Sequence, residues 1–341
     1  MPTDQASRSL WSRFKSFFRS KKPLLILPYR SFANRERIFL KGRVLKNSAI
    51  VETTSNSRLR SLLNSFKRFG TREVPDQEVD IQIEDQHFSV TTDREGYFMI
   101  DRSWKVTEKT SQNQWIEPLL SIPKASAEEP ETTHEAEVLV PSPQTSYGVI
   151  SDVDDTILQT HVNSLLRLRL LYATFFKHPH QRLPMEGIVE LFQQFAGGRS
   201  GKENNPFFYV SNSPWNLYDL LEQFMDIQQL PKGPILLRDY GIKPAGPFSD
   251  HKMEAISRIL EMYPDIPFLL FGDTASKDAD HYLELADQFP GQVKAIYIRF
   301  TKNTRNARRV RQLIEDQKDE NIRIIHSSEE IAQHARQMGL I

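Results

Sequence analysis

From Tyr147 onwards, short apolar runs alternate with amphipathic segments, and this alternation constrains the fold more than any other feature of the sequence. Continuously apolar runs of strand length indicate strands buried on both faces, as in a parallel sheet covered by helices. The segments that begin at Trp215, His251 and Asp280 carry the apolar spacing of helices. We therefore predict an α/β domain with a parallel sheet. The predicted strands are 149–151, 207–210, 235–237, 268–271, 293–298 and 322–325.

Residues 35–141 follow a different pattern, in which apolar and polar residues alternate in short segments separated by turn residues. This pattern is typical of a small antiparallel β-sandwich, and "TTDREGYFMID" resembles the turn and strand of transthyretin-like β domains. The acidic stretch "KASAEEPETTHEAE" is predicted to be a solvated loop before the last strand. The predicted strands are "RIFLKGRVL", "EVDIQIED", "HFSVTTD", "GYFMIDRSW", "WIEPLLSI" and "EAEVLVP".

The length of 341 residues exceeds the usual size of one hydrophobic core, so more than one domain is expected. We predict a basic amphipathic segment at 1–34, a β-sandwich-like domain at 35–141, a linker at 142–146 and the α/β domain at 147–341. As a helix, residues 8–22 would place aromatic side chains on one side and basic ones around them, which is typical of a helix on an anionic membrane. The alternative is a tail whose aromatic side chains dock on the chain's own domain.

Composition excludes several kinds of protein. The chain has no cysteine, which excludes disulfides, thiolate nucleophiles and cysteine-ligated metal sites. Lys and Arg together number 44, as do Asp and Glu, so net charge favours no particular partner. No apolar run is long enough for a membrane-spanning helix, and basic residues interrupt the N-terminal segment where a signal peptide needs an apolar core. We expect a cytoplasmic protein, with peripheral membrane association as a further hypothesis.

Polar side chains follow the strands of the predicted sheet at the edge where parallel strands place ligands. The chemistry that this set supports is phosphoryl transfer. Phosphate monoesters are so unreactive that a carboxylate nucleophile helps by dividing one difficult step into two. The set comprises Asp152, Asp154, Asp155 and Thr156 after the first strand, Ser211, Asn212 and Ser213 after the second, Asp273, Thr274 and Asp278 after "FLLF", and Lys252 at the start of a helix.

Several of these residues have predicted roles. Asp152 is placed to attack phosphorus, and Asp154 to protonate the leaving alkoxide and then deprotonate the attacking water. Mg²⁺ held by Asp152 and Asp273 would neutralise the anions that meet there. Ser211 and Lys252, with Asn212 beside them, would bind the phosphate oxygens.

Alternative interpretations exist for every element of this set. The aspartates could form a calcium loop, but Thr156 and Ile157 stand where an oxygen ligand and the central glycine are required. They could also cap the following helix. Ser211 alone could be a turn hydroxyl, Lys252 alone a solvated lysine, and "GDTASKD" alone a turn. Their joint order beside strands of one sheet favours a phosphotransfer site.

The motifs resemble those of the haloacid dehalogenase superfamily, with "DVDDT" as the first motif and "GDTASKD" as the acidic fourth. More narrowly, "GVISDVDDTIL", "NPFFYVSNSPWNLYDLLEQF", "LPKGPILLRDYG" and the stretch from His251 to Arg299 resemble the actin-patch-type phosphatidate phosphatase family, in its bacterial form with an N-terminal β domain. The resemblance implies a Rossmann-like haloacid dehalogenase fold and Mg²⁺-dependent hydrolysis of phosphatidate to diacylglycerol and phosphate.

Carried over residue by residue, the resemblance implies Asp152 as nucleophile and Asp154 as acid/base, with Asp152, Asp273 and the backbone carbonyl of Asp154 as metal ligands. Asp278 would support the metal-bound waters or orient Lys252, and Thr156 would also lie behind the ligands. The chain departs from the family at Asp155, where many members of the superfamily have glycine, and at Thr274 and Ala275, where relatives tend to have Ser-Gly.

The stretch "LQTHVNSLLRLRLLYATFFKHPHQRLP" mixes leucines with arginines directly after the first motif. It could receive acyl chains and lipid headgroups, or its leucines could pack on the sheet with the arginines solvated. The basic stretch "TKNTRNARRVRQ" lacks aromatic residues for base stacking, so no nucleic acid is expected as partner. Three hypotheses result: a phosphatidate phosphatase acting on an anionic lipid at a membrane surface, a phosphatase for a soluble phosphomonoester, and a non-catalytic membrane- or partner-binding module.

Overall fold

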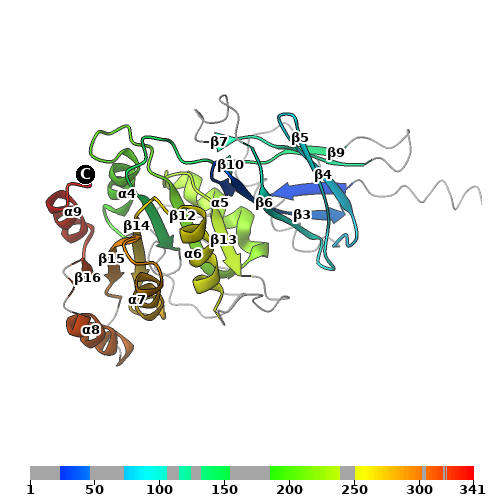
Figure 1. Cartoon of the computed structure of the whole chain (residues 1–341). Helices are drawn as coiled ribbons and strands as arrows, with labels where there is room; N and C mark the ends of the chain where they lie inside the picture. The colour runs from blue at the N-terminus through cyan, green and yellow to red at the C-terminus, as the bar shows by residue number, and fades with distance from the viewer. Residues whose placement is uncertain are drawn as a thin grey trace, which may run out of the picture.

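The computed structural model describes residues 24–46, 73–105, 115–123, 132–153, 185–238, 250–301, 305–317, 319 and 321–341. A β domain (blue to cyan in Figure 1) lies beside a domain in which strands and helices alternate. No helix in these described ranges is long and apolar enough to cross a membrane.

The α/β domain is built on a six-stranded sheet with the order β13-β12-β11-β14-β15-β16. Every neighbouring pair is parallel, and all five residues of the central strand β11 are buried. This confirms the predicted α/β fold with a parallel sheet. The strands are β11 (Gly148–Asp152), β12 (Phe207–Pro214), β13 (Ile235–Arg238), β14 (Phe268–Asp273), β15 (Val293–Arg299) and β16 (Ile322–Ile325).

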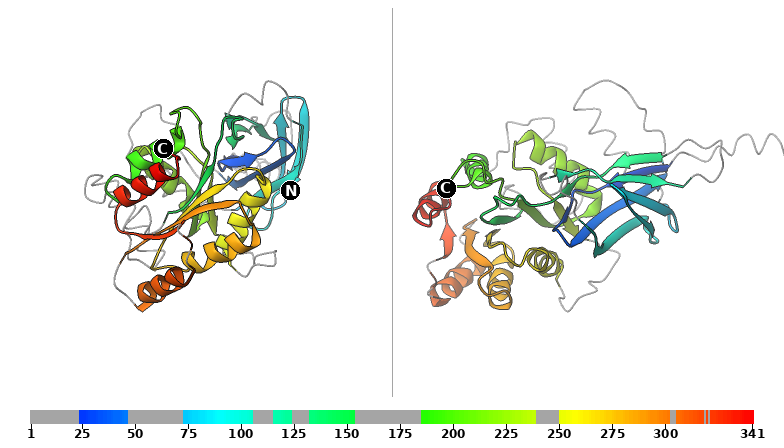
Figure 2. Two further views of the ribbon diagram at one scale, coloured as in Figure 1. Left: turned by 60° about the vertical axis from the view of Figure 1, so that its left-hand side comes forward. Right: turned by 45° about the horizontal axis from the view of Figure 1, so that its top comes forward.

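Helices cover both faces of this sheet, because alternate strand residues point to opposite sides. Val149 belongs to a core with α4, α5 and α9, whereas the next residue, Ile150, belongs to a core with α6, α7 and α8. The two helical layers are visible in Figure 2. The helices are α4 (Ile188–Gly197), α5 (Tyr218–Ile227), α6 (His251–Met262), α7 (Asp278–Gln288), α8 (Arg305–Gln317) and α9 (Ser328–Gln337), with a 3₁₀ turn, η2 (Trp215–Leu217), before α5.

The β domain consists of two sheets around one apolar core, and its strands pair antiparallel except for β2 and β10. All six predicted strand segments contain a strand of the structure. One sheet contains β1 (Leu24–Pro28), β2 (Ser31–Ala33), β3 (Arg37–Lys46), β6 (Tyr97–Ser103), β7 (Trp115–Ile116) and β10 (Val138–Leu139), and the other contains β4 (Glu78–Ile83), β5 (Gln86–Thr91), β8 (Leu119–Ile122) and β9 (Thr132–Glu135).

Two segments differ from the sequence expectation. Strands β1 and β2 lie within residues 24–34, which the predicted domain boundaries assigned to the N-terminal segment. Apolar residues such as Ile26 and Phe32 are buried there. Strand β9 lies in the stretch expected to be a loop, because its backbone pairs with β8 at the edge of a sheet. Its side chains stay mostly exposed, which explains why the stretch reads as polar and solvated.

Candidate metal and phosphate site

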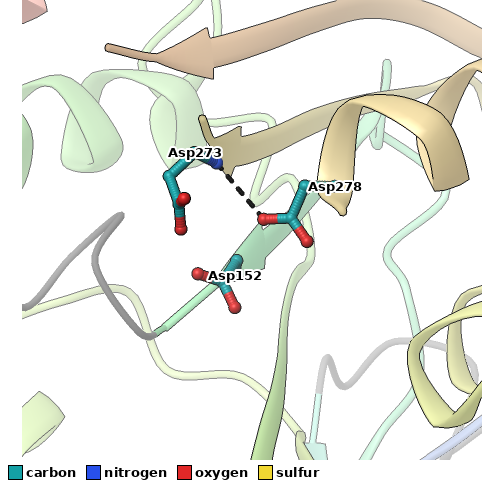
Figure 3. A group of neighbouring side chains, drawn as sticks. All are labelled: Asp152, Asp273 and Asp278. Atoms are coloured by element: carbon teal, nitrogen blue, oxygen red, sulfur yellow. Dashed lines mark hydrogen bonds between the residues drawn. The ribbon is translucent and has the colours of Figure 1, made fainter. Parts of the chain in front are cut away.

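Three aspartates converge at the carboxyl edge of the parallel sheet. Asp152 ends β11 and Asp273 ends β14, and the two strands are neighbours, so both side chains emerge at the same edge. Asp278, the first residue of α7, lies beside them. One carboxylate oxygen from each residue lies within 4.8 Å of the others, and all three side chains are buried (Figure 3).

The turn between β14 and α7 holds two of these carboxylates through backbone N–H groups. Oδ1 of Asp273 accepts hydrogen bonds from the N–H of Ala275 and from that of Ser276, the latter at 2.9 Å. Oδ2 of Asp278 accepts from the N–H of Asp273 at 3.2 Å. Gly272 permits this approach, because a Cβ atom there would lie 2.6 Å from Cβ of Asp278 and 2.7 Å from its Oδ2.

Lys252 enters the cluster from the first turn of α6. Its Nζ donates to Oδ1 of Asp152 at 2.7 Å and to Oδ1 of Asp278 at 2.6 Å, and its side chain is only 3% exposed. Asp250 caps α6 by accepting a hydrogen bond from the N–H of Lys252 at 2.9 Å, which fixes where the lysine side chain begins. Lys252 thus connects the end of β11 to the start of α7.

Charge in this cluster is unbalanced among the described residues, since three carboxylates face one ammonium group. Burial lowers the pKa of Lys252, but the adjacent Asp152 and Asp278 outweigh it and raise that pKa well above its ordinary value. Burial, together with the charge of Asp278, raises the pKa of Asp273 to about 7. Buried oxygen donors with excess negative charge are what a hard divalent cation such as Mg²⁺ or Ca²⁺ requires, so the residues present fit a metal ion.

The second strand end places a hydroxyl next to the cluster. Asp152 and Val210 are register partners in the parallel pair β11–β12, so Ser211 follows directly beyond the level of Asp152. Ser211 is buried, and its Oγ accepts a hydrogen bond from the N–H of Ser213 at 2.9 Å. Asn212, between them, is exposed. The pairing of β12 with β13 is irregular between Ser211 and Pro214, so the strand is locally distorted just beside the aspartates.

The remaining candidate residues lie either outside the described residues or exposed on the surface. Asp154, Asp155, Thr156 and the stretch 158–184 lie outside the described residues, as do residues 8–22. The four arginines from Arg305 to Arg311 are exposed on α8, and Arg309 forms an ion pair with Asp280 at 2.6 Å.

Sequence reasoning missed two residues that shape the site and gave a third an indirect role. Asp250 could have been recognised as a helix cap, because an Asp stands two residues before Lys252 at the start of an amphipathic segment. No sequence signal marks Gly272, because the need for a glycine there arises only from the close approach of α7. Asp278 was expected to support the metal-bound waters or to orient Lys252. Its carboxylate does contact Lys252, and it also lies among the metal-binding candidates.

Comparisons with known proteins support these observations. Residues 147–300 match the family model described as the catalytic domain of phosphatidate phosphatase APP1. Phosphatidate phosphatase APP1 of Saccharomyces cerevisiae is 34% identical over 165 residues, covering 46% of this chain and 26% of the yeast protein. An uncharacterized protein of Schizosaccharomyces pombe is 27% identical over 219 residues, covering 62% of this chain and 34% of its own length. The chain thus spans about a quarter to a third of these relatives.

The comparison with solved structures does not extend these findings. A β-glucuronidase of Bifidobacterium dentium aligns with a TM-score of 0.22 and 10% identity, covering 89% of this chain and 60% of that one. At that score the likeness carries no argument about fold or function.

Proposed function

We propose that this chain hydrolyses phosphatidate to diacylglycerol and phosphate. Residues 147–300 match the model of the catalytic domain of phosphatidate phosphatase APP1, which supports this proposal. The observation that carries the proposal is the convergence of Asp152, Asp273 and Asp278 on Lys252 at one edge of the sheet. The proposed substrate is the one for which the yeast relative is named. We further propose that the α/β domain at 147–341 is the catalytic unit and that it acts at a membrane surface in the cytoplasm.

Asp152 is the proposed nucleophile. One of its carboxylate oxygens forms a bond to phosphorus while the bond from phosphorus to the glycerol oxygen breaks, and Asp154 gives the leaving oxygen its proton. A water molecule, deprotonated by Asp154, then attacks phosphorus and releases phosphate, which restores the Asp152 carboxylate. Asp154 lies outside the described residues, so its part rests on the sequence alone.

Lys252 has two proposed tasks in this reaction. By donating to Asp152 and Asp278 it holds the nucleophile in one orientation, and its positive charge stabilises the negative charge that develops on the phosphoryl oxygens. Ser211 and Asn212 would donate to the remaining phosphate oxygens. When bound by Asp152, Asp273 and Asp278, a divalent cation such as Mg²⁺ supplies further charge neutralisation for the phosphoryl group.

The experiment is a substrate panel with matched metal conditions. Phosphate release is measured from long-chain phosphatidate in mixed micelles and from water-soluble phosphomonoesters, with Mg²⁺ or with EDTA, for the wild type and Asp152→Asn. We expect release from phosphatidate that EDTA and Asp152→Asn each abolish. A protein that prefers a soluble phosphomonoester would support the same chemistry on another substrate. Inactivity on every substrate, with retained binding to anionic vesicles, would replace the proposal with a non-catalytic module.

A further inference from the structure

We infer that Tyr29 and Lys41 of the β domain are positioning residues for the phosphate-binding segment 211–214, on which they act through Trp215. The inference rests on the proposed function and extends it, because it makes the β domain a working part of the phosphate site. We call Tyr29, Lys41, Tyr97, Trp215 and Tyr218 the aromatic clamp.

The aromatic clamp joins the two domains through a continuous stack. The ring of Tyr29 lies 4.4 Å from that of Trp215, with the planes inclined by 26°. On Lys41, Nζ lies 4.4 Å from the centre of the Trp215 ring and 5.0 Å from that of Tyr97. The four rings of the clamp are buried. Ring stacking and cation–π contacts both strengthen when the groups that make them are removed from water.

Tyr29 and Lys41 reach Trp215 as one unit. The N–H of Tyr29 donates to the carbonyl oxygen of Lys41 at 3.0 Å, so the two residues are held side by side in the β domain. A second tie lies next to them, where the N–H of Arg30 donates to the hydroxyl of Tyr218 at 2.7 Å. The buried guanidinium of Arg30 also forms ion pairs with Glu137, within the β domain, and with Glu222, on α5.

Trp215 is directly connected to the proposed phosphate-binding residues. Only three residues separate it from Ser211, and the pairing of β12 with β13 is irregular between Ser211 and Pro214. Pro214 is extended, with φ −74° and ψ 153°, and delivers the chain into the 3₁₀ turn that begins at Trp215. Residues 211–214 therefore lie between two fixed points, the pairing of Ser211 with Leu237 and the stacked ring of Trp215. A shift of Trp215 changes the conformation that this short segment can adopt.

The remaining contacts between the domains do not need the aromatic clamp. On the other face of the sheet, the Phe32 ring lies 5.5 Å from that of Phe208, and the Tyr263 hydroxyl donates to the carbonyl oxygen of Ala33 at 3.1 Å. Nδ2 of Asn34 donates to the carbonyl oxygen of Met262 at 2.7 Å. These contacts dock the domains, so loss of the clamp is expected to loosen the phosphate segment while the domains stay together.

The test uses the full-length chain and binding of inorganic phosphate, measured by calorimetry in the presence of Mg²⁺. Tyr29→Leu removes the stacked ring, and Tyr29→Phe keeps it; Lys41→Met removes the charge, and Lys41→Arg keeps it. Lys232→Met is the matched control, because Lys232 also crosses the domain interface, to Glu137, but does not contact the clamp. Thermal unfolding of every variant is measured alongside.

We expect Tyr29→Leu and Lys41→Met to weaken phosphate binding about tenfold, because small misplacements of binding groups cost one to two orders of magnitude. The ring- and charge-keeping variants and the control stay within about twofold of the wild type. Folded Tyr29→Leu and Lys41→Met proteins with wild-type phosphate affinity would overturn the inference, as would a wild type that binds no phosphate. If Tyr29→Leu does not fold, the phosphate affinity of Lys41→Met alone tests the inference. A wild type that is inactive on phosphatidate, yet shows these binding losses, would overturn only the proposed function.

Discussion

The ammonium group of Lys252 lies 2.7 Å from a carboxylate oxygen of Asp152, and both side chains are buried at the carboxyl edge of the parallel sheet. The same nitrogen reaches Asp278 at 2.6 Å, so one lysine holds together two aspartates that are 126 positions apart in the chain. Buried charges are tolerated only when they are paired. This pairing makes Lys252 a structural necessity of the site as well as its proposed source of positive charge.

Replacing Lys252 by methionine is therefore expected to destabilise the cation-free protein. Removing one partner of a buried ion pair costs about 3–5 kcal/mol, because the carboxylates left behind are uncompensated. Urea unfolding in EDTA measures the loss, and added Mg²⁺ is expected to restore part of it. Lys232→Met removes a lysine from an exposed ion pair and should cost at most about 1 kcal/mol. Equal stability of the two variants would contradict this interpretation of the buried cluster.

Gly272→Ala tests the close approach of α7 to β14. The added Cβ would lie 2.6 Å from Cβ of Asp278, so α7 must shift, at a cost of about 1–3 kcal/mol. Displacing Asp278 should also weaken divalent-cation binding. The matched control is Gly197→Ala near the end of α4, where an added Cβ meets nothing within 4 Å and should change stability by less than about 1 kcal/mol. The measurements are urea unfolding and cation titration of both variants. Unchanged cation affinity in Gly272→Ala would contradict the close approach of Asp278 to Gly272.

The raised pKa of Asp273 predicts that cation binding releases a proton. Burial and Asp278 raise this pKa from 3.8 to about 7, so between these two values the folded, cation-free protein keeps a proton that the unfolded chain has lost. Its contribution to stability therefore falls as pH rises from about 4 to 7 and is fully unfavourable above 7. Because the cation requires the ionised carboxylate, its affinity should rise over the same range.

Calorimetry at pH 6 in two buffers of different ionisation enthalpy counts the released protons. We expect about one proton released per bound cation in the wild type at pH 6, and fewer at pH 8. An affinity that is the same at pH 6 and pH 8 would show that Asp273 is already ionised.

Much of the fold could be predicted from the sequence because its strongest signals are local. Periodicity marks the strands and helices of the α/β domain, and a parallel sheet by itself brings residues that follow its strands to one edge. Asp152 and Asp273 could be placed together on that basis, and the structure puts them there. The cap at Asp250 was within reach of the same reasoning.

What could not be predicted depends on contacts between distant segments. Gly272 matters only because α7 approaches it, and Trp215 matters only because Tyr29, 186 positions earlier, stacks on it. Strand β9 escaped prediction because an edge strand with exposed side chains has the composition of a loop. The alternation of apolar and polar residues carries no information about which distant segments come into contact.

The most direct test of the central claim is titration of the apo-protein with Mg²⁺ by calorimetry, for the wild type and Asp273→Asn. If Asp152, Asp273 and Asp278 form one cation site, the wild type binds one ion per chain at this site and Asp273→Asn loses that binding while remaining folded. Wild-type stoichiometry and affinity in Asp273→Asn would contradict the claim, because the cation would then be held elsewhere.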